Sequence, residues 1–174
     1  MNELQSNQSG NGAIKKGFEK YCNLANNYNV FIFTDLDSAK CAPSLRRSWI
    51  DSSKVEEPLP DGMHFNIAVK EVEAWLLADH ENLKAYLGVR GNKIPRDTQM
   101  DNPKEFLLQY VRRFGNRKAK EELLPKGAAP IGLGYNRYLG QFVEEHWDFE
   151  SAAERNESLQ RALTRIKAVR MKAP

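Results

Sequence analysis

Apolar and polar positions follow two different periods along the chain, and these periods predict where strands and helices lie. Residues 30–34, with the sequence VFIFT, form an apolar run rich in β-branched and aromatic side chains, which is typical of a buried strand. Residues 64–69 have the same character and predict a second strand. Apolar residues recur at helical spacing over residues 13–26, and a further helix is expected over residues 70–88.

The second half of the chain has the apolar period of amphipathic helices. One helix is predicted from about Asn102–Pro103 to Gly115, because a proline suits the first helical position and apolar residues line one face. Further helices are expected over residues 136–147 and towards the C-terminus. The whole pattern predicts an α/β fold, in which a small parallel sheet is flanked by helices and the C-terminal half is mainly helical.

Length and composition fit one domain of ordinary size. The chain has 174 residues, of which 41% are hydrophobic and 28% are charged, so it is long enough to bury a core. We predict a polar tail over residues 1–10, an α/β core over residues 11–90 and a helical portion over residues 91–174 that packs on the same domain. Apolar runs are shorter than the ~20 residues that cross a bilayer, and the polar start lacks a signal core. We therefore expect a cytoplasmic protein with no membrane partner.

Two acidic residues, Asp35 and Asp37, follow directly after the first predicted strand. Side chains alternate along a strand, so both carboxylates are expected to point the same way from its tip. Open α/β sheets bind their ligands at the carboxyl ends of strands. Two hard oxygen donors at this place suit Mg²⁺ or Mn²⁺, and we predict a metal site there. The alternative is an aspartate-rich turn that only ends the strand.

A second pair of acids, Glu71 and Glu73, follows the second predicted strand. If a helix begins near Lys70, Glu71 shares one helical face with Trp75 and Asp79. The alternative is that a glutamate here only favours the helix start through the helix dipole. Carboxylates that converge from both strand ends would repel one another unless cations compensate, and a divalent ion is the simplest compensation.

The net charge of +3 is small, but basic residues gather in two places. One group lies around an expected helix end, and a second runs through residues 161–172. Such groups neutralise phosphates in nucleic-acid-binding proteins, whereas on many proteins they only form a solvated face. The candidate nucleic-acid-binding residues are Arg112, Arg113, Arg117, Lys118 and Arg137.

Several longer segments give these acids a family context. The segments FTDLDS at residues 33–38 and IAVKEVEAWLLAD at residues 67–79 resemble the Toprim fold, the metal-binding domain of topoisomerases, primases and overcoming-lysogenization-defect nucleases. The chain is more closely similar to a small family of standalone prokaryotic Toprim-like proteins. The similarity includes DNPKEFLL at residues 101–108, GYNRYL at residues 134–139 and SLQRAL at residues 158–163.

The chain departs from the Toprim pattern near its start. Toprim domains carry an acidic residue, usually glutamate, at the end of a strand well before the Asp-x-Asp strand, and Glu3 lies in a polar stretch with no strand pattern. Three explanations are open: the chain lacks the family's N-terminal part, it is a shortened member that needs a partner, or it is not catalytic. A small sheet with an exposed edge would favour a homodimer or pairing with a partner protein.

The resemblance also implies a function. It implies phosphodiester chemistry that depends on Mg²⁺ or Mn²⁺, such as that of a nuclease. The implied metal ligands are Asp35, Asp37 and Glu71, and Glu71 or Glu73 would complete the metal shell or hold a second ion, so that all four acids form the catalytic set. Similar proteins look like parts of anti-phage defence systems, so a role in phage defence is expected. The alternative is a non-catalytic Toprim-like binding or regulatory module that acts through a protein partner. A haloacid-dehalogenase-like phosphatase or a sugar-nucleotide transferase would also place two acids after a strand.

Overall fold

The computed structural model describes residues 11–91, 94 and 100–169, and the chain forms two compact units. Unit 1 combines the chain up to Val69 with the residues from Thr164 onward, and unit 2 consists of Lys70–Leu163. The predicted polar tail over residues 1–10 lies outside the described residues. The division after Val69 differs from the expected one after residue 90, because the segment that begins at Lys70 packs with the later helices in unit 2.

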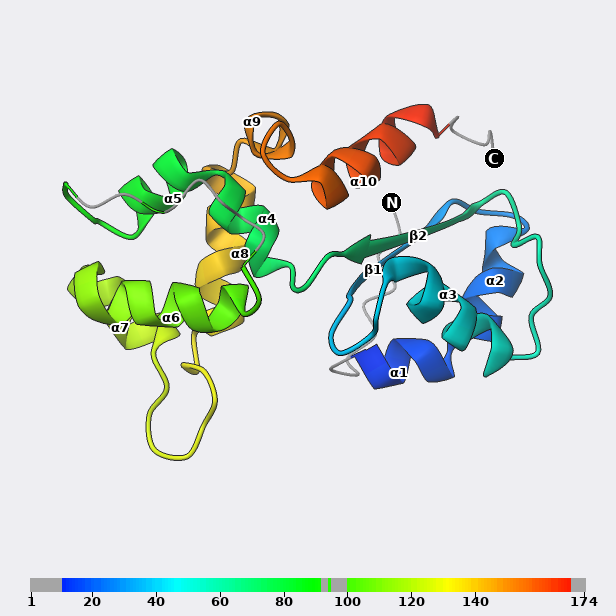
Figure 1. Ribbon diagram of the computed structural model, residues 1–174, viewed down its shortest axis with the longest axis horizontal. Helices are drawn as coiled ribbons and strands as arrows, with labels where there is room; N and C mark the ends of the chain where they lie inside the picture. The colour runs from blue at the N-terminus through cyan, green and yellow to red at the C-terminus, as the bar shows by residue number, and fades with distance from the viewer. Residues whose placement is uncertain (1–10, 92–93, 95–99, 170–174) are drawn as a thin grey trace. The chain divides into compact units, whose positions relative to one another are not determined.

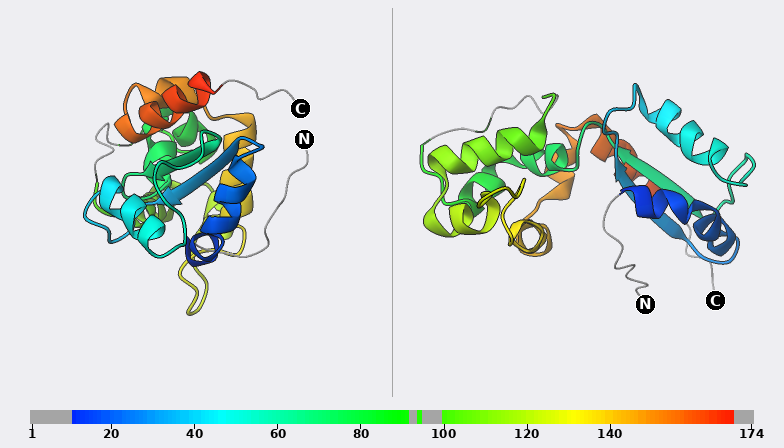
Figure 2. Two further views of the ribbon diagram at one scale, coloured as in Figure 1. Left: turned by 90° about the vertical axis from the view of Figure 1, so that its right-hand side faces the viewer. Right: turned by 90° about the horizontal axis from the view of Figure 1, so that it is seen from below.

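Unit 1 contains a parallel pair of strands with helices against it (Figure 1). β1 spans Val30–Asp35 and β2 spans Met63–Ala68, and their register pairs Val30 with Met63 and Asp35 with Ala68. Figure 2 shows the two strands side by side. The helices of unit 1 are α1 (Asn11–Lys16), α2 (Phe18–Ala25) and α3 (Ala42–Asp51), together with the end of α10 (Glu157–Ala168). The prediction of a small parallel sheet flanked by helices is confirmed.

Aromatic rings on one face of the sheet form the core of unit 1. Phe65 of β2 packs against Phe18 of α2 and Trp49 of α3, with ring centroids 5.6 Å and 4.9 Å apart. Ile32 of β1, which pairs with Phe65 across the sheet, is buried in the same cluster. This core determines which face of each strand is buried. It therefore also determines the direction of the side chains at the carboxyl ends of the strands.

Unit 2 is built of helices around an aliphatic and aromatic core. Leu77, Leu107, Val111 and Phe142 come from three different helices and are fully buried in one cluster. The prediction of a mainly helical C-terminal half is confirmed, and none of the helices in the described part of the chain is long and apolar enough to cross a membrane. The helices are α4 (Glu73–Ala78), α5 (His80–Tyr86), α6 (Pro103–Phe114), α7 (Arg117–Leu123), α8 (Tyr135–Glu145), α9 (Phe149–Ala153) and the first part of α10.

The prediction of one helix over residues 70–88 is wrong. Lys70 has a φ of +73°, in the left-handed region, so a right-handed helix does not start there, and α4 begins only at Glu73. Asp79, with φ −87° and ψ 61°, separates α4 from α5. The expected helical face that joined Glu71, Trp75 and Asp79 is therefore absent, since Glu71 precedes α4 and Asp79 follows it.

The break at Asp79 is held by contacts with distant parts of unit 2. Its buried carboxylate accepts hydrogen bonds from the side-chain amide of Asn82, at 3.0 and 3.1 Å, and from the backbone N–H of Asp148, at 2.7 Å. A buried carboxylate requires such donors, because an unpaired one is costly in a protein interior. Asp79 is therefore a structural residue of the helical unit.

Candidate functional site

Asp35 and Asp37 lie at the carboxyl end of the parallel strand pair in unit 1. Asp35 is the last residue of β1 and is half-buried, Leu36 is buried, and Asp37 is exposed. The backbone N–H of Leu36 donates to the carbonyl of Ala68 at 3.0 Å, so this turn is tied to the end of β2. Asp37 has a φ of +47°, a conformation that aspartate tolerates better than most residues and that is often found in functional turns. Asp35 therefore ends β1 and Asp37 lies in the turn that follows it, and the prediction that both carboxylates point the same way stays a prediction.

The donor chemistry of Asp35 and Asp37 fits a hard divalent ion. Carboxylate oxygens are the ligands that Mg²⁺ and Mn²⁺ prefer, and Mg²⁺ is usually held by one or two carboxylates while it keeps several waters. Among the described residues, no group of three or more histidine, cysteine, aspartate or glutamate side chains is arranged to hold a metal ion. An ion at Asp35 and Asp37 would therefore be rich in water ligands and open to oxygen atoms of a substrate.

Glu71 and Glu73 come together in unit 2, where Lys104 of α6 joins them. Oε2 of Glu71 accepts a hydrogen bond of 2.9 Å from the backbone N–H of Lys104, in the first turn of α6. Oε1 of Glu71 lies 3.4 Å from Nζ of the same lysine. Glu71 thus satisfies an N–H group that has no partner within the helix, as a capping side chain does.

Glu73 is the first residue of α4 and is 3% exposed. Its Oε1 accepts a hydrogen bond of 2.8 Å from the hydroxyl of Tyr135 and lies 3.6 Å from Nζ of Lys104. Its Oε2 is buried and has no hydrogen-bond partner in the described part of the chain. The start of a helix favours a negative charge, and the remaining compensation for Glu73 comes from the lysine and the phenol.

Within unit 2, Lys104 compensates part of the charge of the two glutamates, whereas the sequence pattern had suggested a divalent ion as the simplest compensation. Sequence analysis did not assign Lys104 a role. Its position in the DNPKEFLL segment, just after a helix-starting proline, was the available signal, but nothing in the local pattern links that segment to Glu71. Asp35 and Asp37 lie in unit 1, Glu71 and Glu73 meet at Lys104 in unit 2, and the convergence of all four carboxylates stays a prediction.

The candidate nucleic-acid-binding residues are all exposed, but their surroundings differ. The Arg137 side chain makes two hydrogen bonds to the Glu122 carboxylate, at 2.7 and 2.9 Å, so this charge is already neutralised. Arg117 pairs with Glu121 one turn further along α7, which raises the pKa of Arg117 and lowers the pKa of Glu121 through hydrogen bonding. In the described part of the chain, no carboxylate pairs with the remaining candidates, which are Arg112, Arg113 and Lys118.

Tyr135 and Tyr138, which flank Arg137 in the GYNRYL segment, belong to the core of unit 2. Both side chains are buried, so neither ring is placed to stack on a nucleic-acid base. The Tyr138 hydroxyl donates to the carbonyl of Tyr86 at 3.3 Å, and burial raises the pKa of Tyr138 to about 12. Tyr135 instead holds Glu73, as described above.

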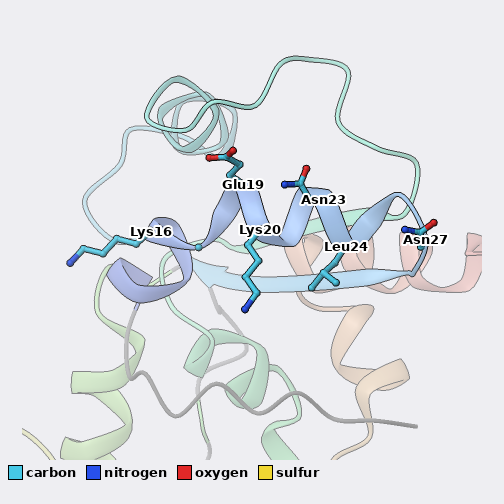
Figure 3. A pocket seen from close by; sticks show the side chains of 7 residues that line it. Lys16, Glu19, Lys20, Asn23, Leu24 and Asn27 are labelled. Carbon is cyan, nitrogen blue, oxygen red and sulfur yellow. The ribbon is translucent and has the colours of Figure 1, made fainter.

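A surface depression in unit 1 runs along α2 and lies outside the predicted site (Figure 3). Polar and charged residues line most of it, and their labelled side chains point in different directions in Figure 3 rather than towards one centre. Specific ligand sites need convergent polar groups, so this depression is not a candidate site.

Comparison of the chain with models of known protein families, with curated proteins and with solved structures returned no match.

Proposed function

We propose that the protein binds Mg²⁺ or Mn²⁺ through Asp35 and Asp37 and processes phosphodiester bonds of a nucleic acid. The observation that carries this proposal is the position of the two acids, which follow β1 at the carboxyl end of a parallel strand pair. A divalent ion held there would polarise a phosphoryl oxygen and lower the pKa of a bound water. The exposed Asp37 carboxylate leaves room for such a substrate, while the half-buried Asp35 is fixed by its strand.

Positive charges in unit 2 support a polyanionic substrate. Arg112 and Arg113 lie in the last turn of α6, and Lys118 lies in the first turn of α7, with all three side chains exposed. Exposed cations of this kind attract phosphates over distances of about 8–10 Å at moderate salt. The resemblance to standalone Toprim-like proteins supports the same substrate class. A cytoplasmic location and a role in prokaryotic anti-phage defence are part of this proposal and rest on that resemblance.

A nuclease assay with matched variants tests the proposal. Wild-type protein is incubated with single- and double-stranded DNA and RNA, with Mg²⁺, with Mn²⁺ or with a chelator. We expect metal-dependent cleavage that Asp35→Asn and Asp37→Asn each abolish, while their circular dichroism stays that of the wild type. Asp61→Asn, which removes an exposed carboxylate from a loop of unit 1, is the control and should keep full activity. Equal cleavage by Asp35→Asn and wild type would overturn the proposal.

Exposed aromatic side chains favour a second candidate, a non-catalytic binding module that acts as a homodimer or through a partner protein. Tyr28 precedes β1, and Phe31 and Phe33 lie on the strand face opposite the core; they are 66%, 38% and 45% exposed. Exposed apolar patches are typical of interaction surfaces. If this candidate holds, Phe31→Ser should weaken association in analytical ultracentrifugation, and wild type should not cleave nucleic acid. An unchanged sedimentation coefficient for Phe31→Ser would count against a homodimer formed through this face.

A further inference from the structure

The Glu71–Lys104–Glu73 cluster has more negative than positive charge. Among the described residues, the two carboxylates share one ammonium group, and they also accept hydrogen bonds from the Lys104 backbone N–H and the Tyr135 hydroxyl. Oε2 of Glu73 is buried and has no hydrogen-bond partner among the residues that the structure describes, which is costly for a carboxylate oxygen in a protein interior. The cluster therefore has an excess of negative charge and a carboxylate oxygen, Oε2 of Glu73, that could bind a cation of higher charge than the Lys104 ammonium.

The contacts between the Lys104 ammonium and the two carboxylates are long. Its Nζ lies 3.4 Å from Glu71 and 3.6 Å from Glu73, whereas a strong charge-assisted hydrogen bond measures about 2.7–2.9 Å. The lysine side chain is 36% exposed, so the ammonium can move towards solvent on its flexible stem. The glutamates are held more firmly, because Glu71 binds the backbone N–H of Lys104 and Glu73 binds Tyr135.

We propose that the Lys104 ammonium occupies the place of a divalent cation between Glu71 and Glu73, and that the two cations compete for this pair of carboxylates. Hard oxygen donors bind Mg²⁺ or Mn²⁺, and such an ion supplies the second positive charge that the pair lacks. In this arrangement the Lys104 ammonium blocks binding of a divalent ion until the lysine side chain moves towards solvent. The inference deepens the proposed function, since it gives the glutamates a cation site in addition to Asp35 and Asp37.

Calorimetric titration with Mn²⁺ tests the competition in an Asp35→Asn background, where binding at the aspartates is weakened. We expect Lys104→Gln in this background to bind Mn²⁺ at least tenfold more tightly than Asp35→Asn alone. Adding Glu71→Gln should remove the gain. Lys84→Gln is the matched control, because it removes another lysine that pairs with a glutamate of unit 2, Glu81 at 3.7 Å, and it should bring no gain. No tighter binding by Lys104→Gln would overturn the inference.

A second measurement uses the wild-type protein and does not depend on the folding of Lys104→Gln. Mn²⁺ that displaces the ammonium should increase the labelling of Lys104 by an amine-reactive reagent severalfold, as read by peptide mass spectrometry, while Lys84 labels at an unchanged rate. Unchanged labelling of Lys104 at saturating Mn²⁺ would contradict the competition. If wild type and Asp35→Asn bind Mn²⁺ equally while the gain from Lys104→Gln persists, the aspartate site fails and the glutamate site stands. If Asp35→Asn binds Mn²⁺ more weakly than wild type and Lys104→Gln brings no gain, the glutamate site fails and the aspartate site stands.

Discussion

The hydroxyl of Tyr135 donates a hydrogen bond of 2.8 Å to Oε1 of Glu73, and both side chains are buried in unit 2. This bond connects α8 to the first turn of α4, two elements that are far apart in the sequence. It also anchors one of the acids that sequence analysis placed in the catalytic set. A buried glutamate held by a phenol and a lysine is a preorganised group, so its surroundings decide both stability and cation binding.

Tyr135→Phe should destabilise the protein, because it removes the short hydrogen bond to a buried carboxylate without changing the ring. We expect the free energy of unfolding to fall by about 1–3 kcal/mol. Urea denaturation followed by circular dichroism measures the change. Tyr28→Phe is the matched control, since that side chain is largely exposed, and it should change stability by less than about 0.5 kcal/mol. Equal stabilities for Tyr135→Phe and wild type would show that the bond contributes little.

Trp75→Ala should be among the most damaging substitutions in unit 2. The Trp75 ring is buried, and its Nε1 donates a hydrogen bond of 2.7 Å to Oγ of Ser158. Loss of the ring and the resulting cavity should cost about 3–5 kcal/mol. Ser158→Ala, which keeps the ring but leaves the indole N–H without this acceptor, should cost about 1–3 kcal/mol. Thermal and urea unfolding of both variants measures these losses of stability. A larger loss for Ser158→Ala than for Trp75→Ala would contradict the prediction.

Two glycine-to-alanine substitutions should have opposite effects. A Cβ at Gly62, just before β2, would overlap the carbonyl oxygens of Ala25 and Tyr28, so Gly62→Ala forces the backbone of unit 1 to shift and should cost about 1–3 kcal/mol. Gly140 lies inside α8 with open space at its Cβ position, so Gly140→Ala should stabilise the protein by about 0.5–1 kcal/mol. A melting temperature that rises for Gly62→Ala would contradict the close approach.

The two cysteines should differ in reactivity with a pH dependence that follows from their pKa values. Hydrogen bonds from Ser44 lower the pKa of the exposed Cys41 thiol, whereas burial raises the pKa of Cys22. A lower pKa gives more thiolate at a given pH, so iodoacetamide should modify Cys41 first, and its rate should reach half-maximum below the ordinary thiol pKa of about 8.5. Ser44→Ala should move that midpoint upwards. A midpoint that does not move would exclude the Ser44 hydroxyl as the main cause, because the variant keeps the backbone N–H of residue 44.

The sequence predicted those features that depend on local pattern. Two apolar runs predicted the strands, and the helix start at Pro103 followed from the proline and the apolar face. The apolar run also predicted that Asp35 ends the first strand, whereas the shared direction of the Asp35 and Asp37 side chains stays a prediction, because Asp37 lies beyond the strand with a φ of +47°.

The features that sequence analysis missed depend on contacts between distant residues. At the break, the Asp79 carboxylate accepts a hydrogen bond from the backbone N–H of Asp148, and no periodicity around residue 79 encodes that partner. In the same way, the positive charge that lies between Glu71 and Glu73 is that of Lys104, which lies on a different helix. At Asp79, tertiary contacts outweighed the helical period of the sequence. At Glu71 and Glu73, they brought in the positive charge of Lys104, which the local sequence does not indicate.

Titration calorimetry with Mg²⁺ and Mn²⁺ on wild type and Asp35→Asn tests the central claim most directly, because it measures ion binding without requiring a substrate. Asp61→Asn serves as the control for removing one exposed carboxylate from unit 1. The account predicts saturable binding by wild type and Asp61→Asn that is lost or strongly weakened in Asp35→Asn. Identical binding curves for wild type and Asp35→Asn, or no binding by folded wild type, would contradict a metal site at the end of β1.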